Sequence, residues 1–305
     1  MLNVGFDPVF IDVLTKILDK SGSLSDTLPG IGDHHPWSSI QLVPGGNGFN
    51  FARALHRKKE NVIFWGKIDP VYEALLKISE PKMKTGTLGE QKKDFTSNIT
   101  VALETTKGEL QINYVNNFVA PNDLQKNAID ALEKTKIVSF LNIGLNREWN
   151  ELFYFMSNII KNNNKLEVAL FDPSTLKDFS QWEELKKWYE ESFKNINANK
   201  IISVNEFEAE KLISKYSLEF FIEIASFFIV HTAEKVSIYS SQKRDTVMVP
   251  VLKNEPLTHV GIGDTFNAGL VYALLRGEDI VKAVKFGIQY AQELMMRGWD
   301  RLGKE

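Results

Sequence analysis

The sequence contains no cysteine in its 305 residues. This absence excludes a disulfide scaffold, thiolate metal sites and a cysteine nucleophile. The five histidines are scattered except for His34 and His35. That pair lacks a His or Glu partner at metal-ligand spacing, so we interpret it as part of a polar loop.

The sequence also lacks dense blocks of Lys and Arg, and its formal net charge is −3. It therefore lacks the cluster of basic residues with which proteins bind nucleic acid or an anionic membrane. The most apolar stretch, 218–230, is short and contains Glu219 and Glu223, whereas a membrane span needs roughly 20 apolar residues. The N-terminal residues lack the pattern of a signal peptide. We expect a soluble, cytoplasmic protein that binds neither nucleic acid nor membrane.

Hydrophobic residues make up 43% of the chain, which is enough for a large core in a single α/β domain of this length. Leu2–Phe6 reads as a short buried strand. From residue 120 onward, strand-like and helix-like patterns alternate, which indicates βαβ units in a parallel sheet with ligands at the carboxyl ends of the strands. The predicted helices are Pro121–Lys134, Trp149–Lys161, Gln181–Ser192 and Glu206–Lys215, and the predicted strands are Ile137–Leu141, Val168–Asp172, Ile201–Val204 and Phe227–Val230.

The stretch Gly261-Ile262-Gly263-Asp264 is a glycine-rich turn that leads into an amphipathic helix extending to Leu275. Both glycines permit backbone angles closed to other residues and let a ligand approach the main chain. The first turn of a helix leaves N–H groups without internal partners, which makes an anion site. A carboxylate at such a site, Asp264, can act as a general base on a hydroxyl. The alternative is a capped helix in which Asp264 has no chemical role.

The longer stretch 261–269, Gly-Ile-Gly-Asp-Thr-Phe-Asn-Ala-Gly, resembles the second signature of the PfkB (ribokinase-like) family of carbohydrate kinases. The resemblance implies a ribokinase-like three-layer α/β/α sandwich with a mainly parallel central sheet and a small β lid, forming one kinase domain over residues 1–305. It implies transfer of the γ-phosphate of ATP, with Mg²⁺, to a hydroxymethyl group of a sugar. Asp264 is then the base, and the N–H groups of Gly261, Ile262, Gly263 and Asp264 form the anion hole.

A second stretch, 44–55, resembles the first PfkB signature, in which paired glycines form a hinge and the following Asn contacts the sugar. Gly45, Gly46 and Asn50 occupy those positions, with a helix beginning near Phe51. Without the resemblance, this stretch is an ordinary glycine turn. The family also has an Asp after the first strand that binds sugar hydroxyls. Asp12 is the better candidate for it and Asp7 the alternative, although either can cap a turn.

Two strand-like runs, Phe95–Leu103 and Leu110–Tyr114, are joined by a turn and predict a β-hairpin. The resemblance makes this hairpin and the strand near Ile40 a lid over the bound sugar, formed by segments near 12–44 and 95–114. It also implies that two copies pair through the lid. The alternative is an ordinary surface hairpin.

At the nucleotide end, Asn205 and Glu208 match an Asn-x-x-Glu motif that the family uses to place magnesium and phosphate through water. Asp172 is a third candidate at a strand end. The alternative reading is that Asn205 caps a helix whose glutamates are solvated.

Two residue patterns near the predicted nucleotide site differ from those of the family. His231, Ala233 and Val236 stand where a Thr and two glycines usually form a turn near the nucleotide phosphates. Thr258 replaces an Asp that some members use for a monovalent cation. These changes predict a relatively high KM for the nucleotide and no activation by potassium.

Three other functions compete with a sugar kinase. A nucleoside kinase of the same fold shares all these motifs. A sugar- or nucleotide-binding protein without turnover would explain the altered nucleotide turn. A dehydrogenase is disfavoured, because its glycine-rich turn follows the first strand and this one lies near the carboxyl end.

Overall fold

The computed structural model describes residues 2–21, 23, 25–26, 38–89, 94–106, 108–174, 176, 179–252, 256–299 and 301–303. His34, His35 and residues 27–37 of the predicted lid segment lie outside the described residues. Within the described part of the chain, no helix is both long and apolar enough to cross a membrane.

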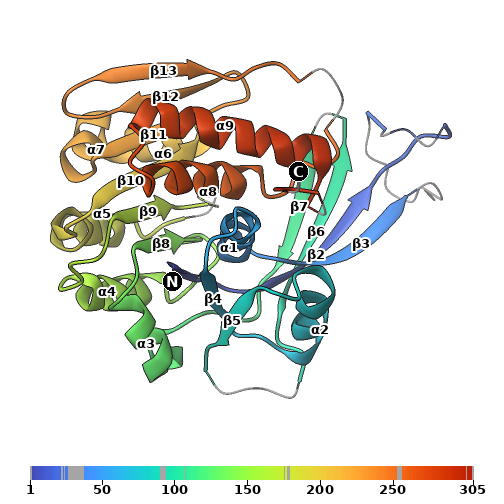
Figure 1. The fold of residues 1–305 in the computed structure, drawn as a ribbon, viewed down its shortest axis with the longest axis horizontal. Coiled ribbons are helices and arrows are strands. Elements are labelled where there is room, and N and C mark those ends of the chain that lie inside the picture. The colour runs from blue at the N-terminus through green and yellow to red at the C-terminus, as the bar shows by residue number, and fades with distance from the viewer. Residues whose placement is uncertain are drawn as a thin grey trace.

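The centre of the fold is a six-stranded sheet with the order β13-β12-β11-β10-β9-β8 (Figure 1). Its strands are β8 (Ile137–Leu141), β9 (Val168–Asp172), β10 (Asn199–Asn205), β11 (Phe227–His231), β12 (Lys235–Tyr239) and β13 (Arg244–Met248). Strands β8 to β11 pair in parallel, and β12 and β13 are added antiparallel at the edge. A parallel three-stranded sheet of β1 (Leu2–Phe6), β4 (Val62–Gly66) and β5 (Lys84–Thr87) continues beyond β8, with β1 beside it.

Helices cover both faces of this sheet, since successive strand residues point to opposite sides. Leu170 of β9, for example, belongs to one core cluster and Phe171 to the other. The first face is covered by α1 (Asn47–Arg57), α2 (Pro70–Ser79), α8 (Ile262–Leu274) and α9 (Ile280–Arg297). The second is covered by α3 (Lys126–Leu132), α4 (Trp149–Ile160), α5 (Trp182–Glu191), α6 (Glu206–Tyr216) and α7 (Leu218–Ile224), with 3₁₀ turns η1 (Pro121–Asp123) and η2 (Phe193–Asn195). The predicted three-layer α/β/α sandwich is confirmed.

Three sequence predictions about these elements are wrong. The single helix predicted over Pro121–Lys134 is divided into η1 and α3, because Leu124 is extended and the Asp123 carboxylate turns back to accept the N–H of Ala120. Helix α1 begins at Asn47, before the predicted start near Phe51. Val236, predicted to lie in a turn, is buried in β12 and pairs with His231 of β11.

A separate four-stranded sheet, order β3-β2-β6-β7, projects beyond the central sheet (Figure 1). It contains β2 (Phe10–Lys16), β3 (Ser39–Gly45), β6 (Asn98–Thr105) and β7 (Gly108–Tyr114). In register, Asp12 pairs with Thr100 and Thr100 pairs with Asn113, so these three side chains share one face. We call this sheet the lid sheet.

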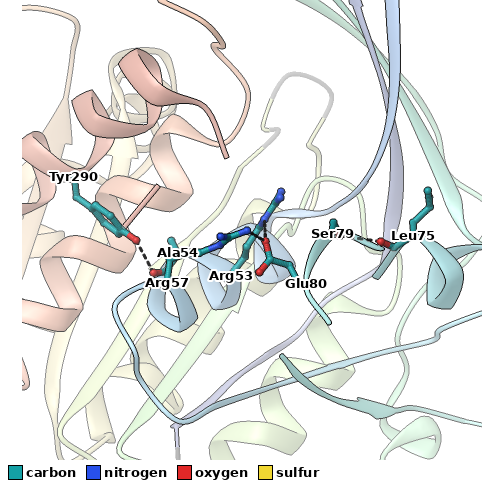
Figure 2. Close-up of polar contacts among 7 residues, drawn as sticks. All are labelled: Arg53, Ala54, Arg57, Leu75, Ser79, Glu80 and Tyr290. Carbon is teal, nitrogen blue, oxygen red and sulfur yellow. Dashed lines mark hydrogen bonds and ion pairs between the residues drawn. The ribbon is translucent and has the colours of Figure 1, made fainter. Parts of the chain in front are cut away.

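Helix α1 is fixed to its surroundings by a buried ion-pair cluster. Arg53 and Arg57 of α1 both contact the Glu80 carboxylate, which follows the C-terminus of α2, and the Arg53 Nε to Glu80 Oε1 distance is 2.7 Å (Figure 2). On the other side, the Tyr290 hydroxyl of α9 donates to the Ala54 carbonyl at 2.7 Å. Because Glu80 and Arg53 are almost wholly buried, this cluster determines how α1 is oriented against the rest of the fold.

Candidate active site

The glycine-rich turn forms the N-terminus of helix α8. Gly261 is the N-cap residue with φ +80°, a left-handed conformation that favours glycine. Its carbonyl accepts the N–H of Thr265 at 2.9 Å, which leaves the earlier N–H groups of the turn without an intrahelical partner. Gly263 is helical and does not use the backbone freedom that glycine permits. A Cβ at Gly263 would meet only the His231 ring, at 3.9 Å, so a ligand can approach here.

Asp264 lies in the first turn of α8, with only 8% of its surface exposed. Its Oδ2 accepts a hydrogen bond from the Asn50 amide at 3.1 Å. Burial, followed by the charge of Asp172, raises the pKa of Asp264 well above its ordinary value, and the bond from Asn50 opposes this rise. The sequence assigned Asn50 to the sugar, but in the structure it also holds the carboxylate assigned as the base.

The carboxyl ends of β8 to β11 each bring a polar side chain to the same edge. They are Asn142 directly after β8, Asp172 in β9, Asn205 in β10 and His231 in β11. Asp172 Oδ2 accepts from the amide of Asn267, at 2.8 Å. Burial raises the pKa of Asp172 to about 6. Polar groups from adjacent parallel strands thus converge beside the α8 turn, where ligands bind in open α/β sheets.

Asn205 and Glu208 form a reciprocal cap at the start of α6. The Glu208 N–H donates to Asn205 Oδ1 at 2.9 Å, and the Asn205 N–H donates to Glu208 Oε2 at 3.0 Å. The capping alternative is therefore confirmed for Asn205. Glu208 is nevertheless buried, unlike a solvated glutamate, and burial together with the charge of Asp172 raises its pKa to about 8.

Asp12 and the paired glycines meet where the lid sheet joins α1. A Cβ at Gly45 would lie 1.8 Å from Asp12 Oδ2, so only glycine leaves room for this carboxylate. Gly46 has φ +103° and is the N-cap of α1. Asp12 and Gly46 line the cavity described below, whereas Gly45 does not.

Asp7, the alternative to Asp12, does not line the cavity. It is fully buried and accepts the N–H of Gly48 at 2.8 Å and the amide of Asn142 at 3.1 Å. Burial raises its pKa to about 7 despite these bonds. Its contacts are those of a structural carboxylate that anchors the first turn of α1.

The three residues predicted to form the altered nucleotide turn, His231, Ala233 and Val236, occupy different environments in the structure. His231 lines the cavity, and burial lowers its pKa to about 4, so its imidazole is neutral at pH 7. Its ring packs against Phe266 with centroids 5.3 Å apart. Ala233 is exposed in the turn between β11 and β12, away from the cavity, and Val236 lies in β12. The turn predicted at Val236 is therefore absent, and Ala233, predicted with His231 to bind the nucleotide, does not line the cavity.

A cavity of about 450 Å³ brings the remaining candidates together. Of the sequence-predicted site residues, it is lined by Asp12, Gly46, Asn50, Asp172, Asn205, Glu208, His231, Gly261, Ile262, Gly263 and Asp264. Sequence reasoning did not assign a site role to the other polar lining residues, Asn47, Thr100, Gln111, Asn113, Asn142, Ser174 and His259. The signals available for them were weak: a polar residue directly after a strand, or one inside an alternating strand.

The donor set suits magnesium held mainly through water. No group of three or more His, Cys, Asp or Glu side chains in the described part of the chain is arranged to hold a metal ion. Mg²⁺ keeps several waters and is commonly bound by one or two carboxylates and the substrate phosphates. Asp172 and Glu208 both line the cavity, close enough for the charge of Asp172 to raise the pKa of Glu208, and their side chains offer such oxygen ligands.

The buried carboxylate lies beside an open helix N-terminus at the edge of a parallel sheet, an arrangement that suits phosphoryl transfer because it combines an acceptor for a proton with N–H groups for the phosphoryl charge. The sequence profile of the pfkB family carbohydrate kinases matches residues 32–297. The chain belongs to this family.

Individual relatives agree with that assignment. The chain is 24% identical to the ribokinase of Bacillus subtilis over 266 residues, covering 86% of this chain and 84% of the relative. Among solved structures, adenosine kinase from Schistosoma mansoni in complex with 2-fluoroadenosine superposes with a TM-score of 0.75 at 15% identity, covering 97% of this chain and 96% of that one. Ribokinase from Cryptococcus neoformans in complex with ADP gives 0.74 at 16% identity, covering 97% and 94%. These structures share the fold with this kinase.

Proposed function

We propose that this kinase transfers the γ-phosphate of ATP to a hydroxymethyl group of a sugar or sugar-like molecule. The observation that carries the proposal is the pairing of Asp264 with the N–H groups of the Gly261 turn. The N–H groups face developing charge on the phosphoryl group, while the carboxylate is beside them to accept the hydroxyl proton. Phosphoryl transfer requires mainly this positioning and neutralisation of charge.

The acceptor would lie between the α8 turn and the lid sheet. Asp12, Asn50 and Asn113 present carboxylate and amide groups to this part of the cavity. Carboxylates accept hydrogen bonds from hydroxyls, and amides both donate and accept, so the set suits a polyhydroxylated molecule. Gly46 would act as the hinge at the base of the lid, and closure would exclude water as a competing acceptor.

The donor would lie across the carboxyl ends of β10 and β11. The neutral imidazole of His231 borders Gly263 without adding charge. When bound, Mg²⁺ supplies neutralisation of phosphate charge, and Asn205 and Glu208 would hold it through water. The ribokinase relative in complex with ADP supports an adenine nucleotide as the donor.

A nucleoside is the second candidate acceptor. It is favoured by the adenosine kinase relative and by a nucleoside kinase from Burkholderia thailandensis solved with inosine, TM-score 0.70 at 14% identity. A coupled assay of ADP release over a panel of sugars and nucleosides separates the two. We expect turnover with a sugar that has a free hydroxymethyl group. Turnover restricted to nucleosides would reject the sugar assignment, and no turnover with any acceptor would reject both.

We also infer that two copies pair through the outer face of the lid sheet. Five large apolar side chains on that face are between 46% and 67% exposed. They are Ile40 and Leu42 of β3 and Leu110, Ile112 and Tyr114 of β7. Register places them opposite the cavity face, and an exposed apolar patch of this kind marks a protein interface.

Analytical ultracentrifugation at micromolar concentration tests this inference. The expected result is a dimer that becomes monomeric in Ile112→Asp. Val251→Asp is the matched control, because Val251 is 93% exposed and lies outside the lid sheet. A monomeric wild-type protein, or an Ile112→Asp protein that remains dimeric, would show that the lid face is not the interface.

A further inference from the structure

The cavity face of lid strand β6 lies along the segment 257–260, which leads directly into Gly261. Three residues of β6 at alternate positions make the contacts. Thr100 lines the cavity, Ala102 packs against Val260 in a small apolar cluster, and Glu104 contacts the residues just before Val260. One face of a single strand therefore reaches from the acceptor end of the cavity to the entrance of the anion hole.

Glu104 makes the most specific of these contacts. Its side chain is almost completely buried, and Oε1 accepts both the Thr258 hydroxyl and the His259 N–H at 3.0 Å. Lys16 of β2 pairs in register with Glu104, and its Nζ donates to the Leu257 carbonyl at 2.5 Å. Two charged side chains at one register position thus hold three successive residues of the segment. Hydrogen bonds that involve charged groups are the stronger class.

The hydrogen bonds of the segment continue into the α8 turn. The Thr258 hydroxyl, which donates to Glu104, also accepts the N–H of Val260 at 3.1 Å. Gly261 follows directly, and its carbonyl accepts the first intrahelical bond, from Thr265. At the other end of β6, the Thr100 hydroxyl donates to the Asn113 amide oxygen of β7 at 2.8 Å. Both side chains line the cavity, so an acceptor bound there contacts β6 and β7 together. A shift of the lid sheet that follows acceptor binding must therefore also shift the segment that carries the anion hole.

We propose that Glu104 is a positioning residue that couples occupancy of the acceptor end to the geometry of the N–H groups at Gly261–Asp264. The proposal rests on the proposed kinase function. It adds that the lid sheet and the N–H groups at Gly261–Asp264 move together because Glu104 connects them. It predicts that acceptor binding raises the affinity for the nucleotide, and that this effect is reciprocal.

The first test measures coupling by binding rather than turnover. ADP with Mg²⁺ is titrated into the protein by calorimetry, with and without a saturating acceptor found in the substrate panel. We expect the acceptor to tighten ADP binding by roughly 5-fold or more in the wild type and by less than about 2-fold in Glu104→Ala. Glu104→Gln should recover part of the coupling, because its amide oxygen still accepts. Coupling that persists in Glu104→Ala, or is absent from the wild type, would overturn the proposal.

The second test needs neither ligand nor activity, so it separates this proposal from the kinase assignment. Amide hydrogen exchange is measured at Thr265, whose N–H is bonded to Gly261 and makes no contact with Glu104 itself. We expect exchange at Thr265 to accelerate about 10-fold or more in Glu104→Ala and to stay unchanged in Glu73→Gln. Glu73 is the matched control because its carboxylate is exposed and pairs with Lys77 of the same helix, α2. Unchanged exchange at Thr265 in a folded Glu104→Ala protein would reject the role of Glu104.

Discussion

The indole of Trp299 packs directly against Gly261, so closely that a Cβ at Gly261 would lie 2.6 Å from Trp299 Cζ2. The Arg53 guanidinium lies over the same indole, 4.4 Å from the ring centroid, and its Nε bonds to Glu80. Two residues one turn apart on α1 thus support the α8 turn, Arg53 through Trp299 and Asn50 through its bond to Asp264. The Asn50 amide nitrogen lies on the same side of Gly261 as the indole, since a Cβ at Gly261 would be 3.4 Å from it. The buried ion pair thus supports the α8 turn through Trp299, and Asn50 supports it directly.

The first prediction concerns Glu80, which neutralises Arg53 and Arg57 in the interior (Figure 2). Glu80→Gln removes the buried carboxylate that both arginines contact, and breaking a buried pair costs about 3–5 kcal/mol. Urea denaturation should show a loss of that size in the free energy of unfolding. Glu73→Gln on the preceding helix removes an exposed pair and should cost about 0–1 kcal/mol. Equal effects of the two changes would contradict this account of α1.

The second prediction concerns Asp264. Asp264→Asn should keep the fold and ligand binding but lower kcat by roughly 10²–10⁴-fold, because the amide preserves shape and removes the base. Stopped assays of ADP formation at saturating substrates measure kcat, and calorimetry with ADP checks binding. A variant with wild-type turnover would show that Asp264 is only part of the helix cap.

The third prediction separates two roles of Asn50. The Asn50 amide stabilises the ionised form of Asp264, whose pKa is raised mainly by burial. Asn50→Ala should therefore raise the pKa of Asp264 further and shift the acidic limb of the kcat profile to higher pH. It should also raise the acceptor KM, since loss of one such polar contact costs about 1–3 kcal/mol. If only the acceptor KM changes and the pH profile stays fixed, Asn50 contacts the sugar alone.

Much of the fold was predictable from the sequence because its signals are local. The alternation of strands and helices after residue 120 and the glycine before α8 depend on periodicity and backbone freedom. The split at Leu124 and the inclusion of Val236 in β12 involve partners close in sequence, the Asp123 bond to Ala120 and the pairing of Val236 with His231, which the periodicity used for the prediction does not report. The alternation of Val236 and Ile238 with polar neighbours was the available strand signal for β12.

The candidate site was predictable only in its motif residues. Asp264 and Asn50 stand in recognisable stretches, but their mutual hydrogen bond joins positions 214 residues apart. Glu104 is an unremarkable glutamate in a strand until the chain is folded, because its partners are 154 and 155 residues away. A sequence pattern shows which residues share one face of a helix or strand. It could not predict these contacts, because each of them joins two different segments of the fold.

The fourth prediction uses the raised pKa of Glu208. In the folded protein this pKa rises from 4.5 to about 8, so between those pH values the folded state binds more protons than the unfolded state. The stability contributed by neutral Glu208 is present below pH 4.5 and is lost as the pH rises through 8. Glu208→Gln stays neutral throughout and still accepts the Asn205 N–H. Its thermal midpoint should therefore match the wild type at pH 5 and exceed it at pH 8.5, and a constant difference across that range would contradict the assignment.

The last prediction concerns monovalent cations at Thr258. The family Asp that serves such a cation is absent here, and the Thr258 hydroxyl is already occupied, donating to Glu104 and accepting the N–H of Val260. A potassium ion at this hydroxyl would have to share its oxygen with the N–H of Val260, whose partial positive charge opposes a cation. We therefore expect the initial rate with ATP at fixed acceptor to be the same in Na⁺ and K⁺ at constant ionic strength. Activation of several-fold by K⁺ would show that backbone carbonyls near Thr258 form a cation site. If K⁺ activates the wild type but not Glu104→Gln, the Glu104 carboxylate has taken over the role of the missing Asp. Glu104→Gln is the informative change because it removes the negative charge of Glu104 and keeps an oxygen that accepts the Thr258 hydroxyl.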